Sequence, residues 1–420
     1  MYQKSCLDNG LRIITSTVPH TRSVCLSFYI GTGSRYEREE EAGISHFVEH
    51  LCFKGTQRRA TAKEISEAIE GVGGILNGGT DKELTVYWCK VAQTHFPLAL
   101  DILSDMILHS HFHPEAVEME RQVILEEINM GLDSPPQRVN MLIDEVLWPH
   151  QALGQDVAGS RETVSRLSPQ SLVDYRRGQY LPSNTVVSVA GDIDPAEVVA
   201  SLGRTFGPWR DEAPRPWFPA DDGQDTPRMH LEYKDTEQAH LCLALRGLSS
   251  LHPQRFILDL LNVILGEGMS SRLFLEIRER QGLAYDIGSY VSHFRDSGSL
   301  IISAGVDPKR LDTTIAAILE ELARLREPIP EEEITKAKEF AKGRLFLHME
   351  DTRNIARWTG AQELLTGRIL TVDEVISIID SLTARDLQEL AQRLVSTQKL
   401  NLAVVGPLRN GRRLKRMLRV

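Results

Sequence analysis

The stretch His46-Phe47-Val48-Glu49-His50 places three metal- or proton-binding side chains within five residues. On a helix, residues four apart lie on one face, so His46 and His50 are neighbours, with Glu49 between them. At about 100° per residue, the apolar side chains point the other way; they are Ile44, Phe47, Val48 and Leu51. We therefore expect a helix over about 42–54 that buries one side and presents His46, Glu49 and His50 on the other.

Two neutral imidazoles on one helix face can bind Zn²⁺ at about 2.0–2.1 Å, and a glutamate beside them can act as a base towards a metal-bound water. The order H-x-x-E-H inverts the H-E-x-x-H of many zinc proteases. So short a pattern also arises by chance in a chain of 420 residues, so His46 and His50 alone leave both interpretations open. Catalytic zinc needs a third protein ligand, which must come from elsewhere in the sequence.

A second predicted helix, over about 114–132, offers that ligand. Glu127 follows Glu120 by seven residues, almost two full turns, so both lie on one face. That face is otherwise apolar, with Ala116, Val117, Val123, Ile124 and Ile128, whereas the opposite face holds Glu115, Glu118, Arg121, Gln122, Glu126 and Asn129. A buried carboxylate needs a partner, because leaving it unpaired is costly. Glu120 and Glu127 are therefore candidates either for a metal site or for a buried salt-bridge pair.

The rest of the chain shows strand and helix patterns in two halves of similar order. In the first half, strands are predicted at about 11–31, 74–91 and 181–194, and helices at about 62–71, 94–108, 136–148 and 194–206. A proline-rich stretch without periodicity follows, and we take 211–228 as a linker. After it come strands at 231–245, 284–306 and 400–405, with helices at 253–266, at 271–281 and through most of 308–395. We expect two α+β domains, 1–210 and 229–420, each a mainly antiparallel sheet covered by helices.

Composition narrows the class of protein. The chain has 420 residues, of which 41% are hydrophobic and 25% are charged, a composition typical of a globular protein. Its net charge is −10, so it lacks the excess of basic residues that is typical of a nucleic-acid binder. Its five scattered cysteines fit a reducing compartment. Neither an apolar stretch long enough to span a membrane nor a secretory signal is visible. We therefore expect a cytoplasmic protein with no membrane partner.

These motifs resemble the M16 peptidase family, which includes pitrilysin, insulin-degrading enzyme and the mitochondrial processing peptidase. The family pattern is H-x-x-E-H, then 76 residues, then a glutamate, and here residues 51–126 separate His50 from Glu127. The resemblance implies that His46, His50 and Glu127 bind one zinc ion per chain and that Glu49 is the catalytic base. Glu120 matches the auxiliary glutamate of the family's E-R-x-V-I-x-x-E pattern, which implies that it orients a histidine or tunes the metal.

A third segment also resembles the family. Residues 74–87 match its G-x-x-N-A-x-T-x-x-E-x-T-x-Y pattern. The match implies that Asn77, Gly78, Gly79 and Thr80 lie in an edge strand that pairs with extended substrate. The family's usual alanine is Gly78 here, and an ordinary hairpin with glycine turns is the alternative interpretation.

In the second half, Arg278 and Tyr285 are seven residues apart, like a family arginine and tyrosine that act on the substrate. The resemblance implies that they hold substrate carbonyls and stabilise the oxyanion. The alternative is purely structural: an arginine on a charged helix and a tyrosine that packs on a strand.

The resemblance implies an M16/LuxS-like metallohydrolase fold and a zinc-dependent endopeptidase that hydrolyses peptides or unfolded segments inside a clamshell chamber. The length corresponds to two of the four domains of long family members. Because one chain holds both the zinc residues and the Arg278–Tyr285 pair, the resemblance implies a homodimer. Two alternatives stay open: a presequence-type processing peptidase, and a non-catalytic, core-like subunit of a peptidase assembly.

Overall fold

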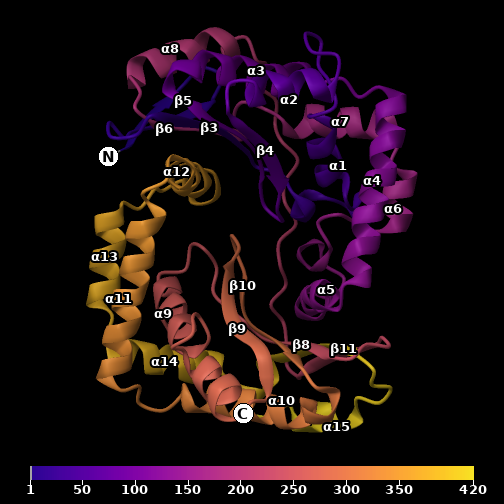
Figure 1. Ribbon diagram of the computed structural model, residues 1–420, viewed down its shortest axis with the longest axis vertical. Helices are drawn as coiled ribbons and strands as arrows, with labels where there is room; N and C mark the ends of the chain where they lie inside the picture. Colours follow the sequence, from indigo (N-terminus) through magenta and orange to yellow (C-terminus); the bar gives the residue numbers. More distant parts are fainter. Residues whose placement is uncertain (1) are drawn as a thin grey trace. The chain divides into compact units, whose positions relative to one another are not determined.

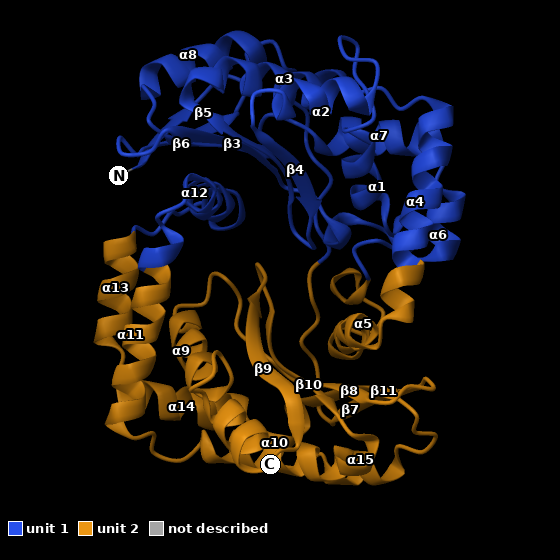
Figure 2. Cartoon of the chain, viewed as in Figure 1, with its two compact units in different colours: residues 1–128, 156–218, 346–371 blue, residues 129–155, 219–345, 372–420 orange. Residues whose placement is uncertain are grey.

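The computed structural model describes residues 2–420, which fold into two compact units (Figure 2). Unit 1 comprises residues 1–128, 156–218 and 346–371, and unit 2 comprises 129–155, 219–345 and 372–420. Each unit is built on one β-sheet with helices packed on it, so the predicted pair of α+β domains is confirmed (Figure 1). None of the helices in the described part of the chain combines the length and the apolar character that crossing a bilayer requires.

Unit 1 holds a six-stranded sheet in the order β1-β2-β6-β3-β5-β4. Its strands are β1 (Tyr2–Cys6), β2 (Arg12–Thr17), β3 (Ser23–Ile30), β4 (Ile75–Thr80), β5 (Thr85–Ala92) and β6 (Thr185–Gly191). Neighbouring strands are antiparallel except β2 and β6, which are parallel. The central strands β3 and β6 are buried almost throughout, because helices cover both faces. One face carries α12 (Thr352–Thr366), and the other carries α3 (Phe96–His109) and α8 (Pro195–Phe206) (Figure 1).

Unit 2 holds a five-stranded sheet in the order β7-β11-β8-β10-β9. Its strands are β7 (Arg228–Tyr233), β8 (Ala239–Arg246), β9 (Ala284–His293), β10 (Gly298–Val306) and β11 (Leu400–Gly406). In chain order they take the same places as β2 to β6 in unit 1, and the parallel pair of β7 with β11 is the counterpart of β2 with β6. The two halves therefore share one topology, as the repeated order of patterns predicted.

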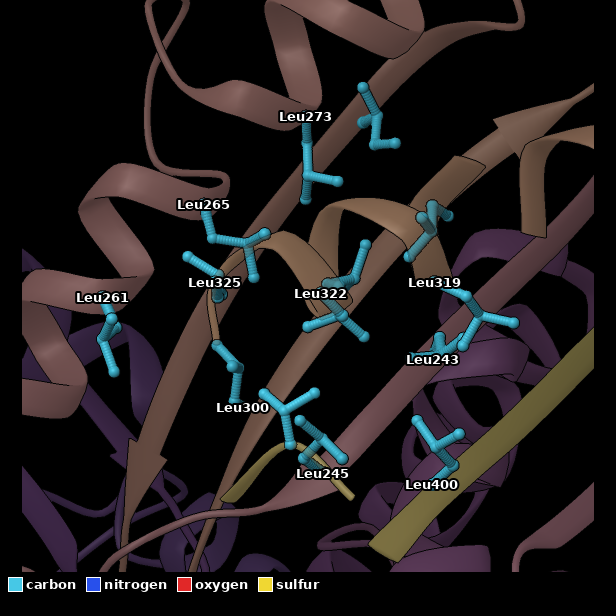
Figure 3. Close-up of a cluster of buried hydrophobic side chains, with 14 of the residues drawn as sticks. Leu243, Leu245, Leu261, Leu265, Leu273, Leu300, Leu319, Leu322, Leu325 and Leu400 are labelled. Atoms are coloured by element: carbon cyan, nitrogen blue, oxygen red, sulfur yellow. The ribbon is translucent and has the colours of Figure 1, made fainter. Parts of the chain in front are cut away.

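The core of unit 2 is a leucine-rich layer between its sheet and three helices, α9 (Arg255–Leu265), α10 (Leu311–Arg324) and α14 (Ala384–Leu394). Figure 3 shows leucines of β8, β10 and β11 beside those of α9 and α10. The opposite face of the sheet is covered by α5 (Pro135–Leu147), whose Val139 and Leu142 share a cluster with Cys242 and Ala244. Because fully burying a leucine contributes about 1.5–3 kcal/mol, this layer makes a large contribution to the stability of the unit.

The remaining helices complete the two units. They are α1 (Ile44–Leu51), α2 (Ala62–Glu70), α4 (Pro114–Asp133), α6 (Arg161–Arg166), α7 (Pro169–Gln179), α11 (Glu331–His348), α13 (Val372–Ser381) and α15 (Arg412–Met417). The sequence patterns did not predict α6 and α7. The helix predicted over 271–281 is a π-helix at Phe274–Arg280.

The units differ from the contiguous halves that the sequence predicted. The chain passes from unit 1 to unit 2 after Phe218, inside the predicted linker 211–228, which holds no helix or strand before β7. Residues 129–155, which carry α5, belong with the second sheet, and residues 346–371, which carry α12, belong with the first. An amphipathic stripe shows which face a helix buries but not which sheet receives it, so periodicity could not place these two helices.

Candidate metal centre and active site

Helix α1 buries the apolar side that the sequence predicted. Its four apolar side chains have no exposed surface; they are Ile44, Phe47, Val48 and Leu51. His46 and His50 are partly exposed on the other side, and Glu49 is 7% exposed. The helix thus holds the three polar side chains of the motif on an anchored support.

The start of α1 is fixed from outside the helix. Gly43, its N-cap, has a left-handed φ of 93° and offers no side-chain cap. A carboxylate from the preceding loop replaces the missing cap, because the buried Glu37 accepts the N–H of Gly43 at 2.7 Å and that of Ser45 at 2.8 Å. Burial, more than any other cause, raises the pKa of Glu37 to about 7, although these hydrogen bonds oppose the rise. The first turn of the motif helix is therefore tied to Glu37.

The two histidines and Glu127 converge on one point. Nε2 of His46 lies 3.0 Å from Nε2 of His50, and Oε2 of Glu127 lies 3.8 Å and 3.7 Å from these two nitrogens. Ligand atoms at about 2.0–2.1 Å from a tetrahedral zinc ion are about 3.3–3.4 Å apart, a value within the observed spread. Two imidazole nitrogens and one carboxylate oxygen also form a known donor set of catalytic zinc. The residues present therefore fit a zinc ion.

Glu120 holds His50 through Nδ1, the ring nitrogen that does not face His46 and Glu127. Its Oε1 accepts the Nδ1–H of His50 at 2.8 Å, and its Oε2 accepts a hydrogen bond from Nζ of Lys54 at 2.6 Å. This bond holds the ring so that Nε2 remains available to a metal. Burial would lower the pKa of His50, but the hydrogen bond to Glu120 and the neighbouring carboxylates outweigh it and raise the pKa. Burial also opposes ionisation of Glu120, yet the hydrogen bonds from His50 and Lys54 hold its pKa below the usual value.

Glu49 is the buried acid of the site. Burial is the main cause that raises its pKa to about 7, while the nearby His50 opposes this rise. Ligand atoms of His46, Glu49 and His50 lie within 4.8 Å of one another, so Glu49 lies beside the point on which His46, His50 and Glu127 converge. A carboxyl group with a pKa near neutrality can both accept and return a proton, which is the property that a general base in hydrolysis needs.

The backbone of strand β4 lies close to the side chain of Glu49. It is the last strand of its sheet, next to β5. A Cβ placed on Gly78 would lie 2.7 Å from Oε1 of Glu49 and 2.9 Å from the ring of Phe53, whereas a Cβ on Gly79 would meet nothing within 4 Å. The predicted segment Asn77–Thr80 therefore lies in an edge strand whose Gly78 packs against Glu49, while the space beside Gly79 is open.

Arg278 and Tyr285 lie side by side within unit 2. The guanidinium of Arg278 lies 5.1 Å from the centre of the Tyr285 ring and 4.6 Å from that of Phe274. Arg278 belongs to the π-helix, a rare element that is frequent at functional sites. Tyr285, near the start of β9, is 80% exposed, so little of its ring packs against the strand.

Helix α4 differs from the predicted wheel in three residues. Glu120 is buried as predicted, but Glu127 keeps 43% of its side-chain surface and Val123 is exposed as well. Arg121, predicted on the solvated face, is buried. It donates hydrogen bonds to two backbone carbonyls at the end of α6 and lies over the ring of Phe47. The buried side of α4 is rotated towards Arg121 because these polar partners satisfy the guanidinium there.

The sequence patterns missed two residues that shape the site, Lys54 and Glu37. Lys54 forms an ion pair with Glu120, and its position four residues after His50 was the available signal. No local pattern marks Glu37 as the cap of α1, because the path of the loop that follows it brings its partners within reach.

Known proteins share both sequence and fold with this chain. A family model described as insulinase (peptidase family M16) matches residues 12–161, and one described as the peptidase M16 inactive domain matches 166–340. The "uncharacterized zinc protease YmxG" of Bacillus subtilis is 38% identical over 98% of this chain and 99% of its own length. The "uncharacterized zinc protease SCO5738" of Streptomyces coelicolor is 36% identical over 97% of this chain and 90% of its own length.

Solved structures agree in fold. A protease from Helicobacter pylori superimposes with a TM-score of 0.91 at 22% identity, over 96% of this chain and 99% of that one. A chain of complex III2 from Candida albicans gives a TM-score of 0.86 at 18% identity, over 99% of both chains. These likenesses establish the fold, and the family resemblance predicted from the motifs is confirmed by the matching models and by relatives that align along nearly the whole sequence. This chain belongs to peptidase family M16, the insulinase family.

Proposed function

We propose that the chain is a zinc-dependent endopeptidase in which His46, His50 and Glu127 hold one zinc ion and Glu49 is the catalytic base. The observation that carries this proposal is the convergence of two Nε2 atoms and one carboxylate oxygen, 3.0–3.8 Å apart, beside the buried Glu49. The metal is supported by relatives that are named zinc proteases. When bound, it would supply Lewis-acid polarisation of a water molecule and of the scissile carbonyl.

Glu49 handles the proton in this scheme. Its carboxylate takes a proton from the attacking water as the oxygen adds to the scissile carbonyl carbon. It returns the proton to the nitrogen of the leaving amine as the C–N bond breaks. Its pKa of about 7 suits both transfers. Glu120 contributes by holding His50 through Nδ1, which fixes the orientation of the ring.

An extended peptide is the substrate that suits the site. It can pair with edge strand β4 through main-chain hydrogen bonds, which demand no particular sequence. Side chains are absent at Gly78 and Gly79, so the peptide backbone can approach Glu49. Peptides and unfolded segments can adopt this extended form with free main-chain groups, whereas most backbone groups of a folded domain are already hydrogen-bonded within it.

We also propose that Arg278 and Tyr285 bind substrate carbonyls, as the family resemblance implies, and that the chain works as a homodimer. A guanidinium and a phenol supply the hydrogen-bond donors that a carbonyl oxygen or an oxyanion needs. Arg278→Ala and Tyr285→Phe should each lower kcat while zinc stays bound. Light scattering tests the dimer, and a fully active monomer would contradict it.

A cleavage assay on a peptide library tests the central proposal. The zinc-loaded chain is incubated with unstructured peptides, and the products are identified by mass spectrometry. We expect internal cuts that stop when a chelator removes zinc and resume when zinc is restored. The control variant His50→Ala should lose metal and activity together.

The same assay separates the two alternatives. Cuts confined to basic, presequence-like peptides would favour a processing peptidase. A correctly folded chain that binds no zinc and cuts nothing would refute the proposal and favour a non-catalytic subunit.

A further inference from the structure

The segment Gly33–Glu37 contacts the turn that follows edge strand β4. Its residues 34–36 form a buried 3₁₀ turn. The N–H of Arg35 donates to the carbonyl of Lys82 at 2.9 Å. A side chain at Gly33 would collide with the backbone of this turn, since a Cβ there would lie 2.0 Å from the carbonyl oxygen of Asp81. The backbone of the segment is therefore packed directly against the end of β4.

A buried ion pair reinforces this contact. Nη1 of the fully buried Arg35 lies 2.5 Å from Oε1 of Glu83, in the turn between β4 and β5. Arg35 also donates through Nε to the carbonyl of Phe218 at 3.0 Å, and the ring of Trp217 lies 4.5 Å away. Removing one member of such a pair leaves an uncompensated buried charge, so the turn is held firmly on Arg35.

The same segment ends at Glu37, which holds helix α1 through the N–H groups of Gly43 and Ser45. Ser45 directly precedes His46, and its hydroxyl lies 2.7 Å from the hydroxyl of Tyr175. Tyr175 in turn lies 2.8 Å from the hydroxyl of Thr32, just before the segment. One short stretch of chain thus contacts both the substrate edge and the first turn of the motif helix.

We propose that Gly33–Glu37 is a positioning segment for the peptidase reaction. Arg35, acting through Glu83, sets the place of the substrate strand β4, and Glu37 sets the place of the helix that carries Glu49. The inference rests on the proposed function, because it takes β4 as the peptide-binding edge and Glu49 as the base.

Strand β4 and helix α1 leave little free space between them. A Cβ on Gly78 would already collide with Glu49, so the two elements are close together. A displacement of about 1 Å between a bound peptide and its catalytic groups can cost about 10²-fold in rate. Arg35 and Glu37 act on the reaction only through Glu83 and α1, so they are positioning residues.

The first experiment removes the ion pair between Arg35 and Glu83 that holds the turn after strand β4. Arg35→Met combined with Glu83→Gln removes both charges, which avoids leaving one of them buried and unpaired. We expect kcat/KM for an unstructured peptide to fall by at least about tenfold, mainly through a higher KM, while zinc content is unchanged. The Kd of the same peptide, measured by fluorescence anisotropy with Glu49→Gln added to the variant and to the wild type, should rise in parallel.

A matched control separates positioning from general stability. Glu363 is another buried carboxylate of unit 1, paired with Lys4 and Arg12 on β1 and β2, at the opposite end of the sheet from β4. Glu363→Gln should lower the melting temperature while KM stays within about twofold of the wild type, as expected for a distant, independent site.

The second experiment weakens the hydrogen bonds to Glu37 that hold the start of helix α1. Glu37→Gln keeps the size of the side chain but replaces one of its two acceptor oxygens with an amide group. The Arg35→Met/Glu83→Gln variant should change mainly KM. Glu37→Gln should instead lower kcat about tenfold and weaken zinc binding, while KM is unchanged. If Glu37 had only a structural role, Glu37→Gln would lower the melting temperature but would leave kcat and zinc affinity unchanged.

The outcomes are decisive in each arm. A folded wild type that neither binds zinc nor cleaves peptide would overturn the proposed function, and the positioning role with it. With an active wild type, a KM for Arg35→Met/Glu83→Gln equal to that of Glu363→Gln overturns the role of Arg35. Unchanged kcat and zinc affinity in Glu37→Gln overturn the role of Glu37. If the double variant does not fold, Arg35→Lys keeps the charge but loses the forked donors, and it should raise KM in the same direction; an unchanged KM overturns the role.

Discussion

Gly78, in edge strand β4, leaves no room for a side chain beside Glu49. An added Cβ would lie 2.7 Å from Oε1 of Glu49, and ordinary contacts begin at 3.4 Å, so the carboxylate or the strand must shift by about 0.7 Å. A displacement of about 1 Å at a catalytic group can cost about 10²-fold in rate. Alanine is usual at this position in the family, and a branched side chain would demand a larger shift, so Gly78→Val should lower kcat by roughly tenfold or more.

The assay for Gly78→Val is steady-state cleavage of a fluorogenic peptide, with zinc content measured on the same sample. Zinc should stay at the wild-type level, because the collision falls on Glu49 and the Phe53 ring and not on a metal ligand. Gly79→Val is the steric comparison, since a Cβ there meets nothing within 4 Å, and it should lower kcat far less. Equal kcat values for Gly78→Val and the wild type would refute the placement of the peptide edge against Glu49.

Three further predictions concern residues around the motif helix. Glu120→Gln removes the charge that holds His50 and Lys54, so the zinc Kd should rise about 10–100-fold; chelator competition measures it, and wild-type affinity would contradict this role. Arg121→Met loses its bonds to two carbonyls near α6 and should lower the free energy of unfolding by about 1–3 kcal/mol in urea denaturation; an unchanged value would argue against those bonds. The folded-state pKa of Glu37, about 7, exceeds its ordinary value of 4.5, so its contribution to stability is full below pH 4.5 and is lost as pH rises through 7. The melting temperature of the wild type relative to Glu37→Gln should fall over that range, and a difference independent of pH would count against the raised pKa.

The motif helix could be predicted because its pattern allows one arrangement. Four apolar residues at helical spacing oppose His46, Glu49 and His50, and all four are buried. The same reasoning found Glu120 as an acid within an apolar stripe, and it is buried and paired with His50. Periodicity and spacing were sufficient wherever the decisive neighbours lie within a few turns of one element.

Contacts between distant segments could not be predicted in this way. Glu37 reaches α1 and Arg35 reaches Glu83 only because loops bring them together. The exposed Glu127 was expected within an apolar stripe, but it lies on the same partly open side as the two histidines. For the same reason, α5 and α12 belong to sheets that lie far from them along the chain, since an apolar stripe does not specify its partner.

Glu49→Gln tests the central claim most directly. The amide keeps the size of the side chain but cannot take a proton from water. Zinc content, circular dichroism and peptide cleavage are measured on one preparation. The account predicts wild-type zinc and folding with kcat lower by at least about 10²-fold. A variant that keeps wild-type kcat would contradict the assignment of Glu49 as the base.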